Sequence, residues 1–348
     1  AGLLFVLPGA MVILVLAGIY ALFGEASLLA GVFFGFKAAV LAIVLQALLR
    51  ISAKALKTGG DRVVAGCAFL AIFALAVPFP LIVLTAGLIG LLRQRQTDQM
   101  AAAPVPGGAR LLPRSLATLA IWGGLWLLPL AALSLILGGD HLLAEVGWFF
   151  SKLAVVTFGG AYAVLAYMVQ QVVGDFGWLT TGEMMDALGL AETTPGPLIL
   201  VTEFVGFLAG AGQGGLGLGV LAALVTLWVT FVPCFLWIFA FAPYVEWITA
   251  QPRLNGALSG ITAAVVGVIL NLSVWFALHV FFAEVAETAL GPITLWLPDL
   301  ATVDLGAILL AGLAGWLLLI RKWDLLAVLA VLAAAGAVWS LGILPLFG

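Results

Sequence analysis

The chain has 348 residues, of which 65% are hydrophobic and 8% are charged, with a net charge of -3 and a mean hydropathy of +1.28. An ordinary soluble domain carries about a quarter charged residues, so this composition excludes a water-facing globular surface. The sequence has no basic run that would bind nucleic acid. Repeated apolar runs of about 20 residues predict an all-α, polytopic transmembrane helical bundle, whereas a β-barrel would show short alternating segments.

Eleven apolar segments are predicted along the chain. They span 3–23, 28–49, 62–77, 79–92, 116–138, 147–171, 184–212, 216–243, 257–282, 304–320 and 324–344. The polar, Pro- and Gly-containing stretch 93–115 is interpreted as a cytoplasmic linker. It divides the remainder of a first transmembrane repeat (1–92) from a second transmembrane repeat with C-terminal helices (116–348).

The distribution of charge predicts the orientation, because cytoplasmic loops collect Lys and Arg. One crossing pattern places eleven of the thirteen Lys and Arg residues inside and leaves only Lys37 and Lys152 within apolar segments. This pattern requires the segment around Pro195-Gly196-Pro197 to cross the membrane. A re-entrant segment is the alternative, and it would place Arg321 and Lys322 outside.

A weak internal repeat appears when the chain is shifted by 225 residues. The shift pairs Leu7-Pro8 with Val232-Pro233, Gly35 with Gly260, Ala38-Ala39-Val40 with Ala263-Ala264-Val265, and Gln46 with Asn271. Such self-similarity is typical of transporters with repeated halves, and the predicted crossings make the halves inverted. The same shift carries the stretch from Phe158 to Pro197 before residue 1, so we expect an N-terminally truncated chain that lacks on the order of 70 to 90 residues.

A set of motifs occurs in a fixed order along the chain. They are Leu7-Pro8-Gly9-Ala10, Gly35-Phe36-Lys37-Ala38-Ala39-Val40, Phe158-Gly159-Gly160, Gly177-Trp178-Leu179, Asp186-Ala187-Leu188 and Ala191-Glu192-Thr193-Thr194-Pro195-Gly196-Pro197. Together they resemble the chromate ion transporter family. The resemblance implies two homologous halves, each with a Phe-Gly-Gly and a Pro-Gly-Pro element, and export of chromate.

The Pro-Gly-Pro element is the first part of the predicted substrate site. Pro195 and Pro197 should break a helix, and the half-helix that restarts near Gly196 would present free backbone N–H groups to a tetrahedral dianion. Thr193 and Thr194 are expected to cap that helix or to donate to the ligand. The alternative is a proline kink that neighbouring helices satisfy.

Two lysines and a tyrosine extend the predicted substrate site. An ammonium group at membrane depth normally faces the bundle interior or a cavity, so Lys37 and Lys152 are expected to attract the anion. Ion pairing is the alternative for Lys37, and snorkelling to the interface is the alternative for Lys152. Phe158, Gly159 and Gly160 are expected at the substrate, with helix packing as the other role of the glycines. Tyr162 is expected to donate a hydrogen bond.

Polar residues within the apolar segments are the predicted coupling pathway. Glu192 and Glu203 would carry protons, or would pair with a lysine. Gln46 and Asn271 would line the pathway or make interhelical hydrogen bonds. Glu183 and Asp186 are instead expected as charges at a helix start.

The leading interpretation is a secondary transporter, not an enzyme, that exports chromate by alternating access across the inner membrane. Sulfate or another tetrahedral oxyanion is the first alternative substrate, and a non-transporting scaffold or subunit is the alternative class. No cofactor or metal is expected, because nucleotide-loop and His-Glu-x-x-His motifs are absent from the sequence. The expected partners are the oxyanion and the lipid bilayer, and the sequence leaves a homodimer open.

Overall fold

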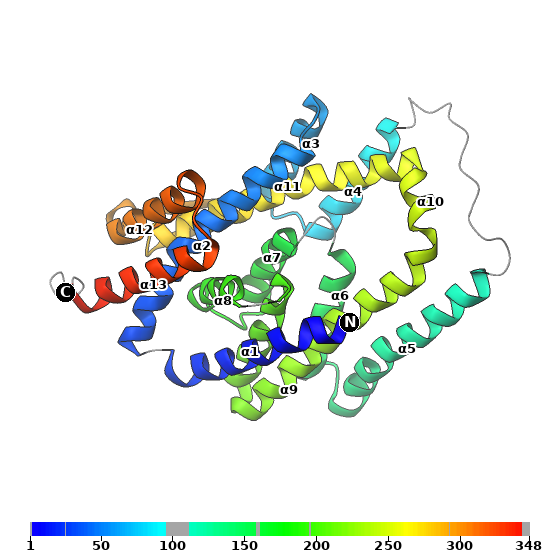
Figure 1. The fold of residues 1–348 in the computed structure, drawn as a ribbon, viewed down its shortest axis with the longest axis horizontal. Coiled ribbons are helices and arrows are strands. Elements are labelled where there is room, and N and C mark those ends of the chain that lie inside the picture. Colours follow the sequence, from blue (N-terminus) through cyan, green and yellow to red (C-terminus); the bar gives the residue numbers. More distant parts are fainter. Residues whose placement is uncertain are drawn as a thin grey trace.

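The computed structural model describes residues 2–24, 26–94, 111–157, 161–194, 196–291 and 293–342. These residues form a bundle of helices with one two-stranded antiparallel hairpin (Figure 1). Six helical stretches within them are long and apolar enough to cross a membrane. The chain is therefore an all-α, multi-pass membrane protein, as its composition predicts.

The helices and strands follow the predicted apolar segments closely. They are α1 (Gly2–Phe23), α2 (Ser27–Ala55), α3 (Gly59–Leu75), α4 (Phe79–Gln94), α5 (Leu111–Leu137), α6 (Leu142–Val156), α7 (Ala161–Val169), η2 (Gln170–Asp175), α8 (Thr181–Thr193), η3 (Leu198–Leu200), α9 (Val201–Phe241), η4 (Ala242–Tyr244), α10 (Val245–Ala250), α11 (Pro252–Phe281), β1 (Val285–Leu290), β2 (Ile293–Pro298), η5 (Leu300–Thr302), α12 (Leu305–Gly315), η6 (Trp316–Ile320) and α13 (Leu325–Gly342). Three differences stand out. The predicted segment 147–171 is two helices, α6 and α7. The predicted segment 184–212 is divided between α8 and α9, and the β1–β2 hairpin was not predicted.

Helix breaks occur at the glycines and prolines of the central region. α8 ends at Thr193, and the chain becomes helical again only at Leu198. α9 is kinked at Gly214 and Gly215, where the φ of Gly215 is +75°. This kink coincides with the predicted boundary between the segments 184–212 and 216–243.

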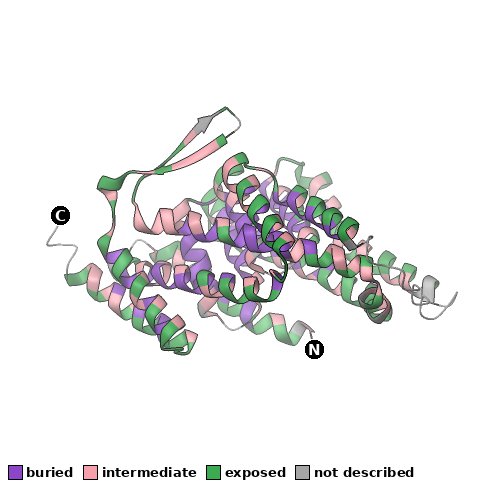
Figure 2. Ribbon diagram, turned by 90° about the horizontal axis from the view of Figure 1, so that it is seen from above, coloured by how far each residue is buried: buried purple, intermediate pink, exposed green. Residues whose placement is uncertain are grey.

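The buried core lies at the middle of the bundle, where α7 and α8 are surrounded by α2, α9 and α11 (Figures 1 and 2). All ten residues from Val201 to Gly210 in the first half of α9 are buried. The outer helices expose many large apolar side chains, such as Leu128 at 70% on α5. Such an outer surface is suited to lipid, so the charged and polar groups of the interior are the ones that need a specific explanation.

The two long helices that the predicted repeat pairs, α2 and α11, have matching bounds and similar packing. Shifted by 225 residues, α2 would span 252–280, and α11 spans Pro252–Phe281. α13 and α12 pack on α2, while α4 and α3 pack on α11. Gly35 approaches the backbone of Leu332 on α13, and its equivalent Gly260 approaches the backbone of Ala86 on α4. If the chain is divided as the sequence predicts, the two parts are interleaved in space, because each packs its long helix on helices of the other.

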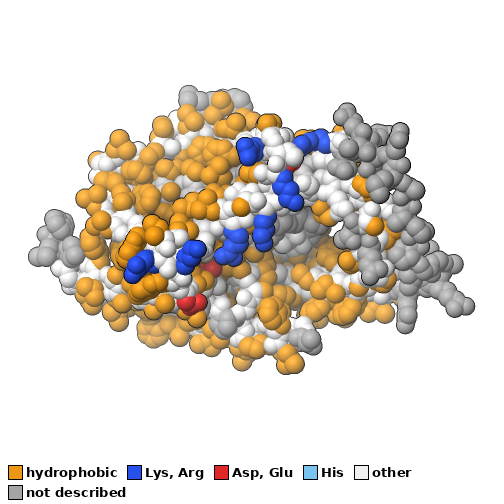
Figure 3. Space-filling view, turned by 45° about the horizontal axis from the view of Figure 1, so that its top comes forward, with side chains coloured by type: hydrophobic (Ala, Val, Ile, Leu, Met, Phe, Trp, Pro, Cys, Tyr) orange, Lys and Arg blue, Asp and Glu red, His pale blue; other side chains and the backbone are white. Residues whose placement is uncertain are grey.

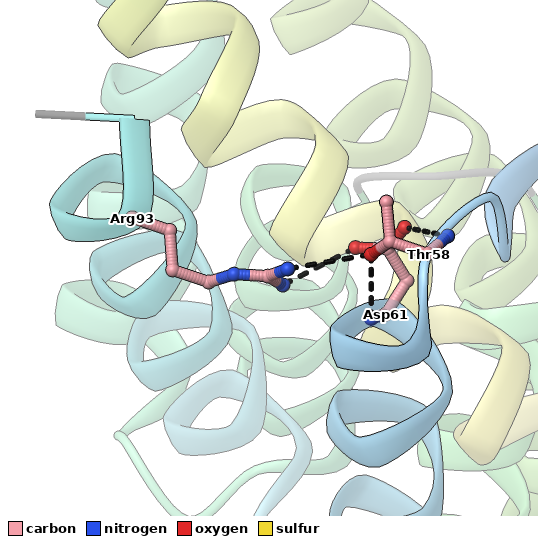
Figure 4. Close-up of polar contacts among 3 residues, drawn as sticks. All are labelled: Thr58, Asp61 and Arg93. Atoms are coloured by element: carbon pink, nitrogen blue, oxygen red, sulfur yellow. Dashed lines mark hydrogen bonds and ion pairs between the residues drawn. The ribbon is translucent and has the colours of Figure 1, made fainter. Parts of the chain in front are cut away.

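A polar cluster joins α3 to α4 (Figure 4). Thr58 caps α3 and accepts a hydrogen bond from the Asp61 backbone N–H, and the Asp61 carboxylate accepts one from the Thr58 backbone N–H. Arg93 at the end of α4 lies 3.2 Å from the same carboxylate. Partial burial opposes ionisation of Asp61, but the Thr58 hydrogen bonds and the Arg93 charge outweigh it and hold the pKa of the carboxyl below its ordinary value.

Lysine and arginine side chains form a band across one face of the molecule (Figure 3). The exposed members of the described chain that lie at the neighbouring ends of α2, α3, α4 and η6 are Arg50, Lys54, Lys57, Arg62, Arg93, Arg321 and Lys322. We call this surface the basic face. Its grouping supports the predicted placement of these residues on one side of the membrane.

Candidate functional site

A cavity of about 650 Å³ opens at the basic face, between α2, the start of α7, the end of α8 and the turn from η6 to α13. We call it the basic-face cavity. Its polar lining residues are Gln46, Arg50, Tyr162, Glu192, Lys322 and Asp324. Three of these, Gln46, Tyr162 and Glu192, are residues that the sequence predicts for substrate binding or coupling.

Two residues of this lining, Tyr162 and Glu192, are joined by a hydrogen bond. The Tyr162 hydroxyl donates to Glu192 Oε1 at 2.9 Å. Tyr162 lies in the first turn of α7, and Glu192 lies at the end of α8, immediately before the Pro-Gly-Pro break. The contact therefore joins the two motif-bearing regions, although Phe158, Gly159, Gly160 and Pro195 themselves lie outside the described residues.

The charges of the cavity balance formally. Arg50 and Lys322 are both exposed and face two carboxylates, Glu192 and Asp324. Interactions between charges are several times stronger beside a low-dielectric interior than in water. Adding a proton to Glu192 would leave the cavity with net positive charge, and it would also change the hydrogen bond with Tyr162.

A second polar cluster lies deeper, between α2 and α8. Lys37 Nζ is 3.1 Å from Asp186 Oδ1, and the Tyr20 hydroxyl donates to Asp186 Oδ2 at 2.8 Å. Asp186 is buried, so its predicted role as a charge at the helix start is wrong. Glu183 does have that role, because it forms a capping box with Thr180. For Lys37 the structure shows the ion-paired alternative.

The Pro-Gly-Pro break packs against α1. Gly196 has a φ of +133°, which L side chains rarely adopt, and a Cβ there would lie 3.6 Å from the Cα of Gly9 in the Leu-Pro-Gly motif. The Thr194 hydroxyl donates to the Ala191 carbonyl, so it does not cap the helix that restarts after Pro197. Its donation to a ligand stays a prediction, and the Thr193 side chain lies outside the description.

Three other predicted residues lie away from the basic-face cavity. Lys152 is exposed on α6. Glu203 in the first turn of α9 is 1% exposed, and its Oε2 has no hydrogen-bond partner among the residues that the structure describes. Asn271 lines a different cavity, next to the β1–β2 hairpin. Their predicted roles in binding or coupling stay predictions.

Sequence reasoning missed Arg50, Lys322 and Asp324 as site residues, along with Tyr20. A signal was present for Arg50, since it follows Gln46 by four residues on α2 and therefore lies on the same helix face. The two residues of the η6–α13 turn reach the cavity through tertiary packing that no local pattern encodes.

Comparison with known proteins agrees with the motifs. The family model "Chromate transporter" matches residues 1–91 and 144–339. The chain is 28% identical to the chromate transport protein of Cupriavidus metallidurans over 280 residues, which cover 77% of this chain and 61% of that protein. It is 31% identical to the chromate transport protein of Pseudomonas aeruginosa over 331 residues, with 91% and 74% covered.

A probable chromate transport protein of Synechococcus elongatus is 28% identical over 272 residues, which cover 77% of this chain and 63% of that protein. No solved structure matches the chain. The chain thus spans between 61% and 74% of the length of these relatives. Since the family match takes in both segments that carry the motifs and the cavity, the chain belongs to the chromate transporter family.

Proposed function

We propose that this chain carries chromate across the inner membrane, in the direction of export, and that the anion enters through the basic-face cavity. The observation that carries the proposal is the meeting of Arg50 and Lys322 with the Tyr162–Glu192 hydrogen bond in one cavity. The family membership and the names of the relatives support chromate as the substrate.

Arg50 and Lys322 supply the attraction for a dianion. Both line the cavity, so their charges raise the concentration of anions at its opening. Gln46 lies one turn deeper on α2 than Arg50 and offers an uncharged amide donor. A charged entrance followed by neutral donors holds the anion without the tight binding that would prevent its release.

Glu192 is the proposed coupling group. While it is ionised, it repels a dianion and occupies the Tyr162 hydroxyl as an acceptor. Once Glu192 takes up a proton, the repulsion disappears and the Tyr162 hydroxyl is free to donate to the anion. Anion and proton would therefore occupy the cavity together, and because the pair still carries net negative charge, a membrane potential that is negative inside drives it outward.

The proposed mechanism is alternating access, in which α7 and α8 separate the two sides of the membrane. α8 ends at Thr193 and η3 begins at Leu198, with Gly196 at a φ of +133° between them, and this break is the proposed hinge. Sulfate is the second candidate substrate, because a cavity with these donors accepts any tetrahedral oxyanion.

The test is uptake of radiolabelled chromate into inverted membrane vesicles that carry this chain. Arg50→Gln is compared with Lys54→Gln, which removes a neighbouring exposed cation on α2 that does not line the cavity. We expect Arg50→Gln to lower uptake about tenfold, equivalent to about 1.4 kcal/mol, and Lys54→Gln to leave it near the parent level. Equal uptake by the two variants would contradict the proposed entry site.

Two further comparisons separate the mechanism from the substrate. Glu192→Gln is expected to retain uptake and to lose its dependence on pH, because the side chain is then permanently neutral. Excess sulfate serves as the competitor, and strong competition would favour the broader oxyanion specificity. Absence of chromate uptake by the correctly inserted parent chain would overturn the proposed function.

A further inference from the structure

A second polar cavity, of about 480 Å³, lies beside the β1–β2 hairpin, and the proposed function does not use it. We call it the hairpin cavity. It is bounded by the end of α7 and η2, by α3 and α11, and by both strands of the hairpin. Its lining includes Gln170, Asn271, His279, Glu287 and Trp296, whereas a cavity that faced lipid would be lined by apolar side chains alone.

The sequence repeat relates the two cavities. Gln46 and Asn271 are equivalent positions of α2 and α11 under the shift of 225 residues. Gln46 lines the basic-face cavity, and Asn271 lines the hairpin cavity. Equivalent residues of inverted halves lie at opposite depths of the membrane, so this pair is expected to face opposite sides.

Helix α7 connects the two cavities directly. Tyr162 in its first turn lines the basic-face cavity, and Val169 and Gln170 at its other end line the hairpin cavity. The eight steps from Tyr162 to Gln170 rise about 12 Å at 1.5 Å each. Between them Val164 and Met168 are completely buried, so a short apolar barrier separates two polar spaces.

The hairpin cavity is rich in hydrogen-bond acceptors. Gln170 Oε1 is buried and has no hydrogen-bond partner within the described part of the chain. His279 Nδ1 lies 2.9 Å from the Trp275 carbonyl oxygen, so Nδ1 donates a hydrogen bond and Nε2 of the neutral ring is an acceptor. Glu287 and Asp175 add carboxylates. Unlike the basic-face cavity, this lining contains no Lys or Arg, and it therefore holds a dianion weakly.

We infer that the hairpin cavity is the release vestibule of the transport path, water-filled and open to the side opposite the basic face. The inference rests on the proposed function and adds the route of exit. The oxyanion is attracted by cations on one side, passes the apolar barrier of α7 when the bundle changes conformation, and leaves from a cavity whose acceptors favour its release. Gln170 belongs to a π-helical segment, a geometry that is frequent at functional sites.

Accessibility of introduced cysteines tests this inference without requiring transport. The two native cysteines, Cys67 and Cys234, are free and exposed, so both are first replaced by alanine. Asn271→Cys and Gln46→Cys are then treated with a membrane-impermeant, anionic thiol reagent from either side of the membrane. Leu270→Cys is the matched control, because Leu270 is the neighbouring, partly exposed apolar residue of α11 and does not line the cavity.

We expect Asn271→Cys to react only from the side opposite the basic face, Gln46→Cys only from the basic face, and Leu270→Cys slowly from both. Modification of Asn271→Cys should also lower chromate uptake at least several-fold. Reaction of Asn271→Cys from the basic face, or from neither side, would overturn the inference. The labelling pattern without any transport would instead count against the proposed function alone, and transport with an inaccessible Asn271→Cys would count against the vestibule alone.

Discussion

The charges of Lys37 and Asp186 stabilise the interior only as a pair. The two side chains come from different helices, and Tyr20 supplies a second hydrogen bond to the same carboxylate. Burying an ionised group costs free energy unless a partner compensates it, and removal of one partner leaves the other exposed to the full cost. Single and double substitutions should therefore behave very differently.

The first prediction concerns this pair. Lys37→Met should lower the free energy of unfolding by about 3–5 kcal/mol, because it leaves Asp186 buried without its cation. Lys37→Met combined with Asp186→Asn should recover most of that loss. Unfolding in detergent followed by tryptophan fluorescence measures both. Losses that simply add in the double variant would show that the two groups do not interact.

Tyr162 provides the second prediction. Tyr162→Phe removes the donor to Glu192 and the proposed donor to the anion, so chromate uptake should fall about fivefold to thirtyfold, equivalent to about 1–2 kcal/mol. Tyr167→Phe is the matched control, since Tyr167 is on the same helix but is buried between the rings of Phe79 and Phe149. Equal uptake by the two variants would remove Tyr162 from the path.

The sequence identified residues of the candidate site only where a polar side chain stands in or beside an apolar run, because few other roles explain it there. Gln46, Tyr162 and Glu192 are polar residues inside or next to apolar runs, and the structure brings them to one cavity. Lys37 was expected to be functional or ion-paired, but its partner Asp186 could not be identified. The partner is determined by the packing of α2 on α8, and each helix alone is compatible with many neighbours.

Glycines determine how closely the helices approach. A Cβ at Gly35 would lie 1.9 Å from the Leu332 carbonyl oxygen on α13, whereas a Cβ at Gly18 on α1 would meet nothing within 4 Å. Close approach of backbones is a principal source of helix association in lipid, where burial from water contributes little. Replacing Gly35 or Gly18 by a larger residue should therefore affect the stability of the protein in different ways.

The third prediction follows from this difference. Gly35→Ala should destabilise the protein by about 1–3 kcal/mol or more, because the backbone of α13 has to move away. Gly18→Ala should be neutral or stabilising by up to about 1 kcal/mol through its helix propensity. The temperature of unfolding of the two purified variants gives the comparison. A Gly35→Ala protein as stable as the parent would show that α2 and α13 pack less closely than described.

The fourth prediction is the pH dependence of the contact between α3 and α4. Because the pKa of Asp61 is lowered in the folded protein, its carboxylate stabilises the fold above its unfolded pKa of about 4 and loses that effect as the pH falls through the lower, folded value. Asp61→Asn should remove this part of the acid sensitivity. Unfolding temperatures between pH 6 and pH 3 test it, and parallel curves for parent and variant would contradict it.

Most helices could be predicted because a membrane requires every backbone group of a spanning segment to be satisfied within that segment. The β1–β2 hairpin was missed although signals were present. Gly291 has a positive φ at the turn, and the strands contain Val285, Thr288, Ile293 and Trp296, which are residue types that favour strands. The hairpin lies between the predicted segments 257–282 and 304–320. A search for apolar runs of about 20 residues passes over strands of six residues.

At the scale of the whole molecule, the two predicted repeats are held together by an exchange of neighbouring helices. α2 of the first repeat packs on α12 and α13, and α11 of the second packs on α3 and α4. The sequence predicted the repeat but not this exchange. The boundary between two repeats in the sequence does not reveal which helices pack together in space.

The fifth prediction tests the exchange. Fragments 1–102 and 103–348, co-expressed as separate chains with a tag on one of them, should co-purify, because α2–α13 and α4–α11 are both contacts between fragments. Gly35→Leu and Gly260→Leu each disrupt one of these contacts, so each should lower recovery of the partner fragment, and the double variant should lower it further. Gly18→Leu, at an open position, should leave recovery unchanged. Independent purification of both fragments as folded, unassociated proteins would contradict an interleaved structure and would indicate two repeats that fold side by side.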